Sequence, residues 1–483
     1  MAGAVSVKKT SDVTNFGRNI RFRPSYCYAP DSEQEVLDIL ARHQGESFRV
    51  VGRLHSWSPL AVTSGVCLDL RKLNQVRIQD DDGRVLATVG GGCQIKRMLV
   101  ELRRLANVTS PSVGLITEQT IAGAISTGTH GSGKHSLSHY MREIRVATYD
   151  SNGQPEIRSF DSGDELRAAR CSLGLLGIIL SVSFDCRPAY LVEEHVRFHD
   201  SLSLAVAEEA AYPLQQIFVI PWSWHVFGQH RREIDGKQNS LAYLARIYWL
   251  LGIDIGLHLI LLTLAKLLRS NTITQFFYQK IFSGLVLQNL RIVDESERVL
   301  VMEHELFRHI EMELFVPCDK LAEAVEFVKD VIRGFGGRMQ DVTRAGREQL
   351  EQMNLWDSLV KRSGTYCHHY PICIRRILAD DTLISMASGD TTYYSISLIS
   401  YQRLSDRDNF DHFTRFLADA MEGPFKARVH WGKLCPQDAG TLQRLYPRLE
   451  EFKRICEQHD PQAVFRNSFV ADRLGLPSPD KVD

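Results

Sequence analysis

A histidine in a turn that begins with glycine is the first candidate for chemistry. The turn reads Gly52-Arg53-Leu54-His55-Ser56 and follows an apolar, strand-like run, and further along residues 122–133 read AGAISTGTHGSG. Glycines let the backbone approach a pyrophosphate closely, and successive N–H groups form a nest for anions. Together the two segments predict a nucleotide cofactor that is cradled by backbone and held by one histidine. Taken alone, a histidine near a strand end is more often a hydrogen-bonded structural residue than a cofactor ligand.

The glycine-rich loop also comes close to a known phosphate-binding pattern. Residues 128–134 read GTHGSGK, which nearly matches G-x-x-x-x-G-K. However, His135 stands where that pattern needs Ser or Thr to hold magnesium, and residues 117–127 are small and polar instead of forming a buried apolar strand. An anion nest is therefore favoured over a P-loop, and Gly90-Gly91-Gly92 offers a second tight turn.

Histidines elsewhere do not have the spacing of metal ligands. His130, His135 and His139 do not form a helical pair with a carboxylate, and no cysteine lies near them. His368 and His369 are adjacent, so on a strand they would point to opposite faces. The sequence predicts no metal site.

A compact motif near the C-terminus, His430-Trp431-Gly432-Lys433, places a lysine beside an aromatic residue. Such a lysine can stabilise a flavin or a substrate oxyanion. The alternative is an ordinary solvated lysine, which is the more common state of a charged side chain.

The composition is that of a globular chain with more than one domain. The chain has 483 residues, of which 44% are hydrophobic and 24% charged, which predicts two or three domains. Its net charge of −1 argues against nucleic acid as a partner. The ten cysteines contain no C-x-x-C pair, which favours free thiols in a reducing compartment. Residues 1–26 contain no apolar core of a secretory signal, so we expect a cytoplasmic protein or one at the periphery of a membrane.

One apolar segment, residues 241–268, approaches the length of a membrane span. Asp254, His258 and Lys266 interrupt it, and a charge inside a bilayer is costly. The segment is therefore predicted to form a buried or interfacial helix, whose first part, residues 241–249, can lie on a bilayer.

The coarse pattern of elements indicates an α+β protein. In the first part we expect helices over residues 32–41 and 95–105 and strands over 48–51, 66–70, 85–89, 144–148 and 178–184. Regular βαβ repeats are absent, which disfavours a doubly wound nucleotide-binding fold.

A new section begins near Arg187-Pro188. Strands over residues 309–316, 371–378 and 393–400, with a helix over 320–332, predict an antiparallel sheet with a helix on one face. The tail is expected to hold short motifs and one helix, over residues 439–458.

These motifs, in this order, resemble the aldonolactone and alditol oxidases of the vanillyl-alcohol-oxidase flavoprotein superfamily over nearly the whole chain. The matching segments are the His55 turn, residues 15–19, 89–92, 122–133, 172–178 and 430–433, and Asp460-Pro461 with Phe465 and Asn467. The apolar insert 241–268 is similar to one in the membrane-associated animal gulonolactone oxidases.

The resemblance implies a two-part, PCMH-type FAD-binding domain with an antiparallel-sheet-plus-helix cap domain. Its expected boundaries are 1–190 for the FAD-binding domain, 191–425 for the cap with the insert 241–268, and 426–483 for the segment that returns to the FAD domain. The implied reaction takes a hydride from a CH–OH carbon of a sugar-lactone or alditol-like substrate to flavin N5, and oxygen or another acceptor then takes the electrons.

The resemblance also assigns residues to the cofactor, with His55 as the covalent attachment point of FAD. The implied cofactor-binding residues are His55, Gly52, Arg53, Leu54, Ser56, Gly91, Gly92, Ala122, Gly123, Thr127, Gly128, Thr129, His130, Gly131, Ser132, Gly177, Ile178 and Lys433.

The substrate half departs from the family pattern. The family's cap strand carries Glu-x-Arg, whereas this chain has Cys373-Ile374-Arg375, and Ser395 and Ser397 stand where alditol oxidases place His and Thr. The resemblance implies that Arg375 and Lys433 stabilise flavin N1 or the substrate, with Ser395, Ser397 and Cys373 beside it. A thiol cannot accept two hydroxyl hydrogen bonds as a carboxylate does. Two alternatives therefore stay open: the same fold acting on a non-sugar substrate, and a membrane-associated protein with a vestigial flavin site.

Overall fold

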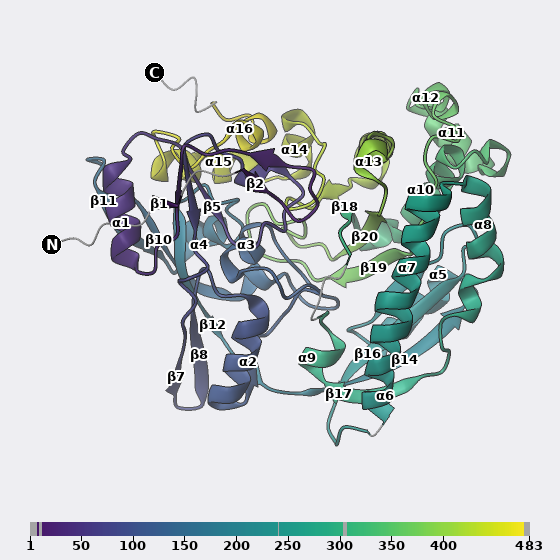
Figure 1. The fold of residues 1–483 in the computed structure, drawn as a ribbon, viewed down its shortest axis with the longest axis horizontal. Coiled ribbons are helices and arrows are strands. Elements are labelled where there is room, and N and C mark those ends of the chain that lie inside the picture. Colours follow the sequence, from purple (N-terminus) through teal and green to yellow (C-terminus); the bar gives the residue numbers. More distant parts are fainter. Residues whose placement is uncertain (1–6, 9–11, 240, 303–306, 478–483) are drawn as a thin grey trace.

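A computed structural model describes residues 7–8, 12–239, 241–302 and 307–477 of the chain (Figure 1). Parts of the N-terminal segment in which no secretory signal was expected, and the end of the C-terminal segment 426–483, lie outside the described residues. Three sheets of four or more strands organise the described part of the chain.

The first part of the chain builds a small sheet that leads to the His55 turn. Its strands lie in the order β1 (Val7–Lys8), β4 (Tyr26–Tyr28), β6 (Val66–Asp69) and β5 (Phe48–Val51), and β4 and β5 both run parallel to β6. Helix α1 (Glu33–Arg42) connects β4 to β5 and begins at Ser32, whose side chain accepts a hydrogen bond from the Glu35 N–H. Its apolar face packs with these strands in one buried cluster.

A second, antiparallel sheet lies next to it. Its five strands run in the order β11 (Pro155–Phe160), β10 (Met141–Tyr149), β12 (Ile178–Asp185), β8 (Arg84–Gly90) and β7 (Val76–Asp81). Helices α2 (Ile95–Ala106), α3 (Ile121–Ser126) and α4 (Gly163–Arg170) pack with this sheet. The strands and helices expected in this part of the chain are confirmed to within a few residues at each end.

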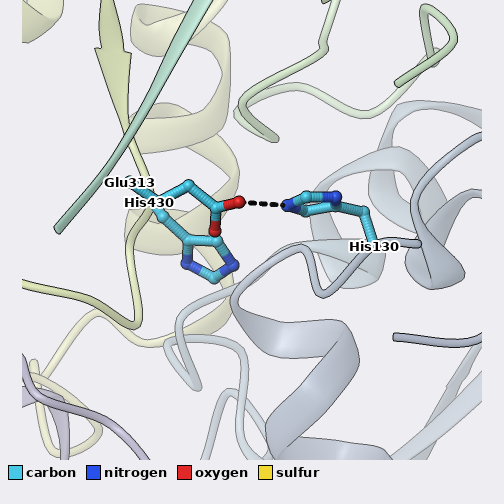
Figure 2. Close-up of side chains that lie close together, drawn as sticks. All are labelled: His130, Glu313 and His430. Carbon is cyan, nitrogen blue, oxygen red and sulfur yellow. Dashed lines mark ion pairs between the residues drawn. The ribbon is translucent and has the colours of Figure 1, made fainter. Parts of the chain in front are cut away.

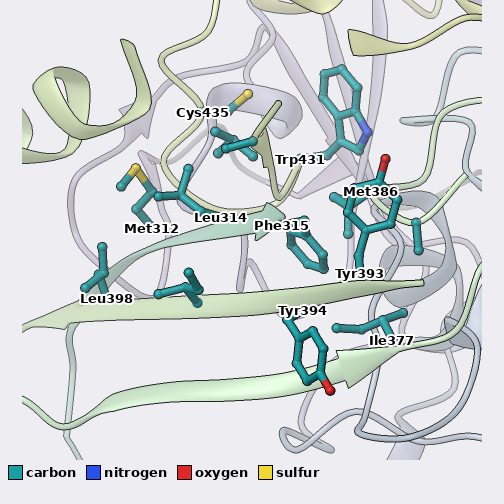
Figure 3. Close-up of a cluster of buried hydrophobic side chains, with 14 of the residues drawn as sticks. Met312, Leu314, Phe315, Ile377, Met386, Tyr393, Tyr394, Leu398, Trp431 and Cys435 are labelled. Atoms are coloured by element: carbon teal, nitrogen blue, oxygen red, sulfur yellow. The ribbon is translucent and has the colours of Figure 1, made fainter. Parts of the chain in front are cut away.

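The middle of the chain forms an eight-stranded antiparallel sheet. The order is β17 (Arg291–Glu295), β14 (Leu191–His199), β16 (Val226–Ile234), β15 (Gln216–Val219), β19 (Ile372–Ile377), β20 (Tyr393–Ser400), β18 (Ile310–Pro317) and β21 (Arg428–Val429). Helices α10 (Leu321–Phe335) and α13 (Arg407–Phe425) pack against each other and against β18. Met312 and Leu314 of β18 point into the buried apolar cluster on this side, together with Leu398 and Trp431 (Figure 3).

The apolar insert forms one long helix beside this sheet, as predicted. It runs over Leu241–Leu268, with α-helical turns in α6 (Leu241–Tyr248) and α7 (His258–Leu262) and π-helical turns after each of them. By length and composition alone, this helix could cross a membrane. One side packs inward, with Leu257 and Leu261 buried, while Leu244 and Leu251 on the other side are 61% and 58% exposed.

The tail returns to the first part of the chain, as Figure 1 shows. The expectation of one helix over residues 439–458 is wrong, because the segment forms two helices, α14 (Ala439–Leu445) and α15 (Leu449–His459). Pro447 separates them: its ring disfavours helical geometry in the preceding residue, and Tyr446 is extended. The last helix is α16 (Ser468–Leu474).

Backbone and side-chain hydrogen bonds fasten the tail to the small sheet. The Phe48 N–H donates to the Val464 carbonyl at 2.7 Å, and the Asn467 amide donates to the Pro59 carbonyl at 2.9 Å. Arg49 is buried and donates to three carbonyls, those of Leu60, Phe465 and Leu173, at 2.6, 2.6 and 2.8 Å. Burial lowers the pKa of Arg49 to about 10, so it remains charged at neutral pH.

We expect Arg49→Met to destabilise the protein by at least about 3 kcal/mol, because it leaves three buried carbonyls without a charged donor. The measurement is the Tm in scanning calorimetry with cofactor present. Arg71→Met is the control, since Arg71 is exposed and pairs with Asp69 at the surface. Equal Tm values for the two variants would show that Arg49 does not hold the tail in place.

Candidate functional site

Two cavities meet between the parts of the fold described above. The smaller has a volume of about 160 Å³ and is lined by the His55 turn, residues of β5 and α3, the segment after α4 and the tail. The larger, about 670 Å³, lies against the eight-stranded sheet and the long helix. Trp57, Gln119, His430 and Lys433 line both cavities, so the two spaces adjoin at these residues.

The His55 ring is positioned at the edge of the smaller cavity. Strand β5 ends at Val51, and the chain then turns through Leu54, which has a left-handed φ of 57°. Phe16 stacks on His55 with ring centroids 4.9 Å apart, and the Phe16 N–H donates to the Leu54 carbonyl at 2.8 Å. Packing of the N-terminal segment therefore fixes the turn that carries His55.

Glycines shape the smaller cavity where the backbone of two strands comes close. A side chain at Gly91 would overlap the Ile179 carbonyl, and Gly177 has a φ of +124°, which L-residues rarely adopt. Such a cradle of backbone suits a flat or phosphate-bearing cofactor, as expected from the sequence. Gly52, Arg53, Leu54, His55, Ser56, Gly91, Ala122, Gly123, Thr127, Gly177 and Lys433 all line this cavity.

The predicted loop over residues 128–133 is placed differently. The N–H groups of Gly128, Thr129 and Gly133 donate to carbonyls of the protein itself, which makes them unavailable to a phosphate. Thr129 and His130 line the larger cavity, and Ser132 donates to the Gln215 carbonyl of the sheet region. Gly92, Gly128, Gly131, Ser132 and Ile178 line neither cavity. The loop mainly joins the cradle to the eight-stranded sheet.

The sheet presents the predicted substrate-side residues to the larger cavity. Cys373, Arg375 and Ser397 line it, and register places Cys373 opposite Ser397 and Arg375 opposite Ser395. Ser395 is fully buried and does not line the cavity. The Gln216 amide donates to the Cys373 sulfur at 3.0 Å, and burial raises the pKa of this thiol to about 11.

Two carboxylates that the sequence analysis did not single out complete this wall. Glu311 and Glu313 alternate with Met312 and Leu314 on β18, so both point toward the cavity. Glu313 accepts hydrogen bonds from Arg375 at 2.7 Å and from Ser397 at 2.9 Å. Their signal in the sequence was two acidic residues at period 2 in a strand that is otherwise apolar.

The motif at residues 430–433 closes the site from the tail. Trp431 is buried and donates its ring N–H to the Ile384 carbonyl at 2.7 Å, and the His430 N–H donates to the Glu313 carbonyl at 3.0 Å. Lys433 forms an ion pair with Glu311 and lies 4.7 Å from the centre of the Trp57 ring. Lys433 therefore lines both cavities as a paired lysine and is not an ordinary solvated one.

His130, on the loop over residues 128–133, lies close to the side chains of Glu313 and His430, as Figure 2 shows. Its Nε2 lies 3.3 Å from Glu313 Oε1. Burial alone would raise the pKa of Glu313, but the Arg375 guanidinium lowers it well below its usual value, so the carboxylate is ionised. Burial lowers the pKa of His430, which keeps that ring neutral. Where the two cavities adjoin, the protein thus offers fixed cations, carboxylates and a histidine to a hydroxyl group or an oxyanion.

Comparison with known proteins agrees with this geometry. The family model for D-arabinono-1,4-lactone oxidase matches residues 216–473, and a model for an FAD-binding domain matches residues 24–154. A long-chain alcohol oxidase from an uncultured marine euryarchaeote is 49% identical over 95% of this chain and 96% of its own length.

More distant relatives cover the same span. An L-gulono-1,4-lactone dehydrogenase of Mycobacterium tuberculosis is 27% identical over 94% of this chain and 96% of its own. An alditol oxidase of a Streptomyces species is 24% identical over 96% and 99% of the two chains. A solvent-stable cholesterol oxidase has the same fold, with a TM-score of 0.74 at 15% identity over 98% of both chains.

The expected fold class, a PCMH-type FAD-binding fold with an antiparallel-sheet cap, is confirmed. The residues present suit FAD, since glycines at close backbone approaches line the smaller cavity together with His55. The chain belongs to the D-arabinono-1,4-lactone oxidase family of FAD-linked oxidases and is an FAD-dependent oxidoreductase that acts on CH–OH groups.

Proposed function

We propose that the protein oxidises the CH–OH group of an alcohol that carries a long apolar chain. The observation that carries this proposal is the apolar wall of the larger cavity. This wall begins beside the charged residues Glu313, Arg375 and Lys433 and continues along the long helix. Phe227, Ile253, Leu257, Phe282 and Val286 contribute to it. A volume of about 670 Å³ lies within the range of small-molecule sites.

The chemistry at the junction suits such a substrate. We infer that Arg375 and Lys433 stabilise negative charge on the substrate oxygen or at flavin N1, with Ser397 and Cys373 beside the reacting carbon, and Ser395 lies opposite Arg375 in the sheet. Bound FAD supplies the hydride acceptor, and oxygen or another acceptor takes the electrons afterwards. The relative named as a long-chain alcohol oxidase supports the same reading.

A sugar-lactone or alditol-like substrate is the second candidate. The lactone dehydrogenase and the alditol oxidase among the relatives support it. A polyol in the apolar part of the cavity would leave hydroxyls without partners, at about 1–3 kcal/mol for each buried group. At the far end of the cavity Arg231 and Glu194 already pair with each other, at 2.7 Å.

We further propose the division into an FAD-binding part (1–190), a cap (191–425) and a returning segment (426–483). The hydrogen bonds from Phe48 and Asn467 that fasten the tail to the first part support this division.

Oxidation of primary alcohols of different chain lengths tests the proposed substrate. Primary alcohols of increasing length should show a KM that falls about fourfold for each added CH₂ until the cavity is full, since each buried CH₂ contributes about 0.8 kcal/mol. The measurement is steady-state oxidation, with aldonolactones and alditols assayed in parallel. Faster turnover of the sugar-derived compounds, with a KM for alcohols that does not depend on length, would favour the second candidate.

We propose that His55 is bonded covalently to FAD. Acid-precipitated wild-type protein should then retain its flavin absorbance, whereas His55→Ala should release flavin into the supernatant. His412→Ala is the matched control, because His412 is exposed on α13. Release of flavin from wild-type protein would rule out the covalent bond while leaving FAD binding intact.

We also propose that the outer side of the helix Leu241–Leu268 rests on a bilayer surface. Exposed apolar residues gather on the helix and on α8 (Asn271–Lys280) next to it, and they include Tyr243, Leu244, Leu251, Leu267 and Phe276. An amphipathic helix with such a face binds in the membrane interface. The protein would then be peripheral to a membrane, with the inner side of the helix lining the substrate cavity.

Flotation with phospholipid vesicles tests this contact. Wild-type protein should float, and the triple variant Leu244→Glu, Leu251→Glu and Leu267→Glu should remain at the bottom of the gradient. Val100→Glu is the control, since Val100 is 63% exposed but lies on α2, far along the chain from the insert. Flotation of the triple variant would exclude this face as the membrane contact.

A further inference from the structure

We propose that His130 and Glu313 act together as the acceptor of the substrate's hydroxyl proton. The inference rests on the proposed oxidation of an alcohol and names the base that this reaction needs. Both residues line the larger cavity, yet they come from opposite walls: His130 from the loop after α3 and Glu313 from β18.

The hydrogen-bond partners of His130 define where its protons lie. Its Nδ1 is 3.0 Å from the Gly131 carbonyl oxygen, which can only accept, so Nδ1 carries a hydrogen. In the neutral ring Nε2 is then an unprotonated acceptor. This nitrogen faces Glu313 Oε1 at 3.3 Å, so two acceptors meet with space for one proton between them.

Glu313 is held in place to receive that proton. Arg375 Nη2 and Ser397 Oγ donate to the same Oε1 that faces His130. The side chain of Glu313 is 1% exposed, so water does not compete for these bonds. Lys433 forms an ion pair with Glu311, the other carboxylate of the strand, so Glu313 is the carboxylate that faces His130.

Neighbouring groups cannot take this role. His430 Nδ1 accepts the Gly432 N–H at 3.0 Å, so the neutral ring carries its hydrogen on Nε2 and can donate but not accept there. Cys373 stands where the family has a carboxylate, but its raised pKa keeps the thiol protonated at neutral pH. Register places Cys373 opposite Ser397 and Ser397 opposite Glu313, so the carboxylate lies in the same row of the sheet, two strands further on.

The same three side chains, His130, Glu313 and His430, would also be close enough to surround a metal ion, with ligand atoms within 4.8 Å of one another. Two features favour a proton over a metal. Arg375 and Ser397 already donate to Glu313 Oε1, the oxygen that faces His130, and His430 could ligate through Nε2 only by giving up the tautomer that its bond to Gly432 requires.

The O–H bond breaks and its proton enters the gap between His130 Nε2 and Glu313 Oε1. The C–H bond breaks as the carbonyl double bond of the product forms, and bound FAD would supply the acceptor of the hydride. Release of the proton from the pair to solvent, or to the final electron acceptor, would restore His130 and Glu313.

The variants Glu313→Gln and His130→Gln test the pair in the flavin-loaded protein. We expect anaerobic flavin reduction by a primary alcohol to slow by about 100-fold or more in each, the usual contribution of a general base. The alcohol should still bind, and the residual rate should rise with pH as hydroxide replaces the base. Glu326→Gln and His412→Gln, on the outer helices α10 and α13, are the controls. Rates close to wild type in both site variants, at equal flavin content, would overturn the inference.

A measurement without substrate separates this inference from the proposed function. Proton NMR of the flavin-loaded protein should show a hydrogen-bonded imidazole proton at His130 Nε2 as the pH is lowered, and Glu313→Gln should abolish it. Absence of that proton from wild-type protein would overturn the pair even if alcohols are oxidised. If no alcohol reduces the wild-type flavin, the proposed substrate fails, while the NMR result still decides whether the pair holds a proton.

Discussion

The buried charge of Glu313 is the constraint on which the site depends. A carboxylate that is removed from water must be compensated, or it would disrupt the sheet that carries it. Here Arg375 and Ser397, on β19 and β20, donate hydrogen bonds to the carboxylate, and His130 faces it from the loop after α3. The His430 N–H of the tail donates to the main-chain carbonyl of the same residue. Glu313 thus joins segments that lie far apart in the sequence.

The two cavities acquire their distinct characters from the same arrangement. The smaller is walled by backbone at glycine positions and suits the cofactor, whereas the larger is walled by side chains of the sheet and the long helix. Because Lys433 and His430 belong to both linings, they stand where cofactor and substrate must meet. The larger cavity combines the charged groups near Lys433 with apolar residues of the sheet and the long helix.

The elements around the smaller, cofactor-side cavity could be predicted from the sequence because they depend on local chemistry. Glycine turns, a histidine after a strand and a capped helix are set by neighbours along the chain, and α1, β5 and β12 begin at or within one residue of the expected positions. The residues that line the larger, substrate-side cavity were harder to predict. The role of Glu313 depends on cross-strand register with Ser397 and on a loop far away in the sequence, which no periodicity encodes. The loop over residues 128–133 was assigned to phosphate by its glycines, but the amides of Gly128, Thr129 and Gly133 bond within the protein.

The return of the tail determines when the cofactor site can exist during synthesis. Arg49 of an early strand finishes its set of hydrogen bonds only with the Phe465 carbonyl, and Gly432 and Phe465 both line the smaller cavity. During synthesis the smaller cavity therefore lacks the part of its lining that the tail supplies until these residues have left the ribosome. Flavin capture is consequently a late event in biogenesis, coupled to closure of the whole chain and not to completion of the segment that contains His55.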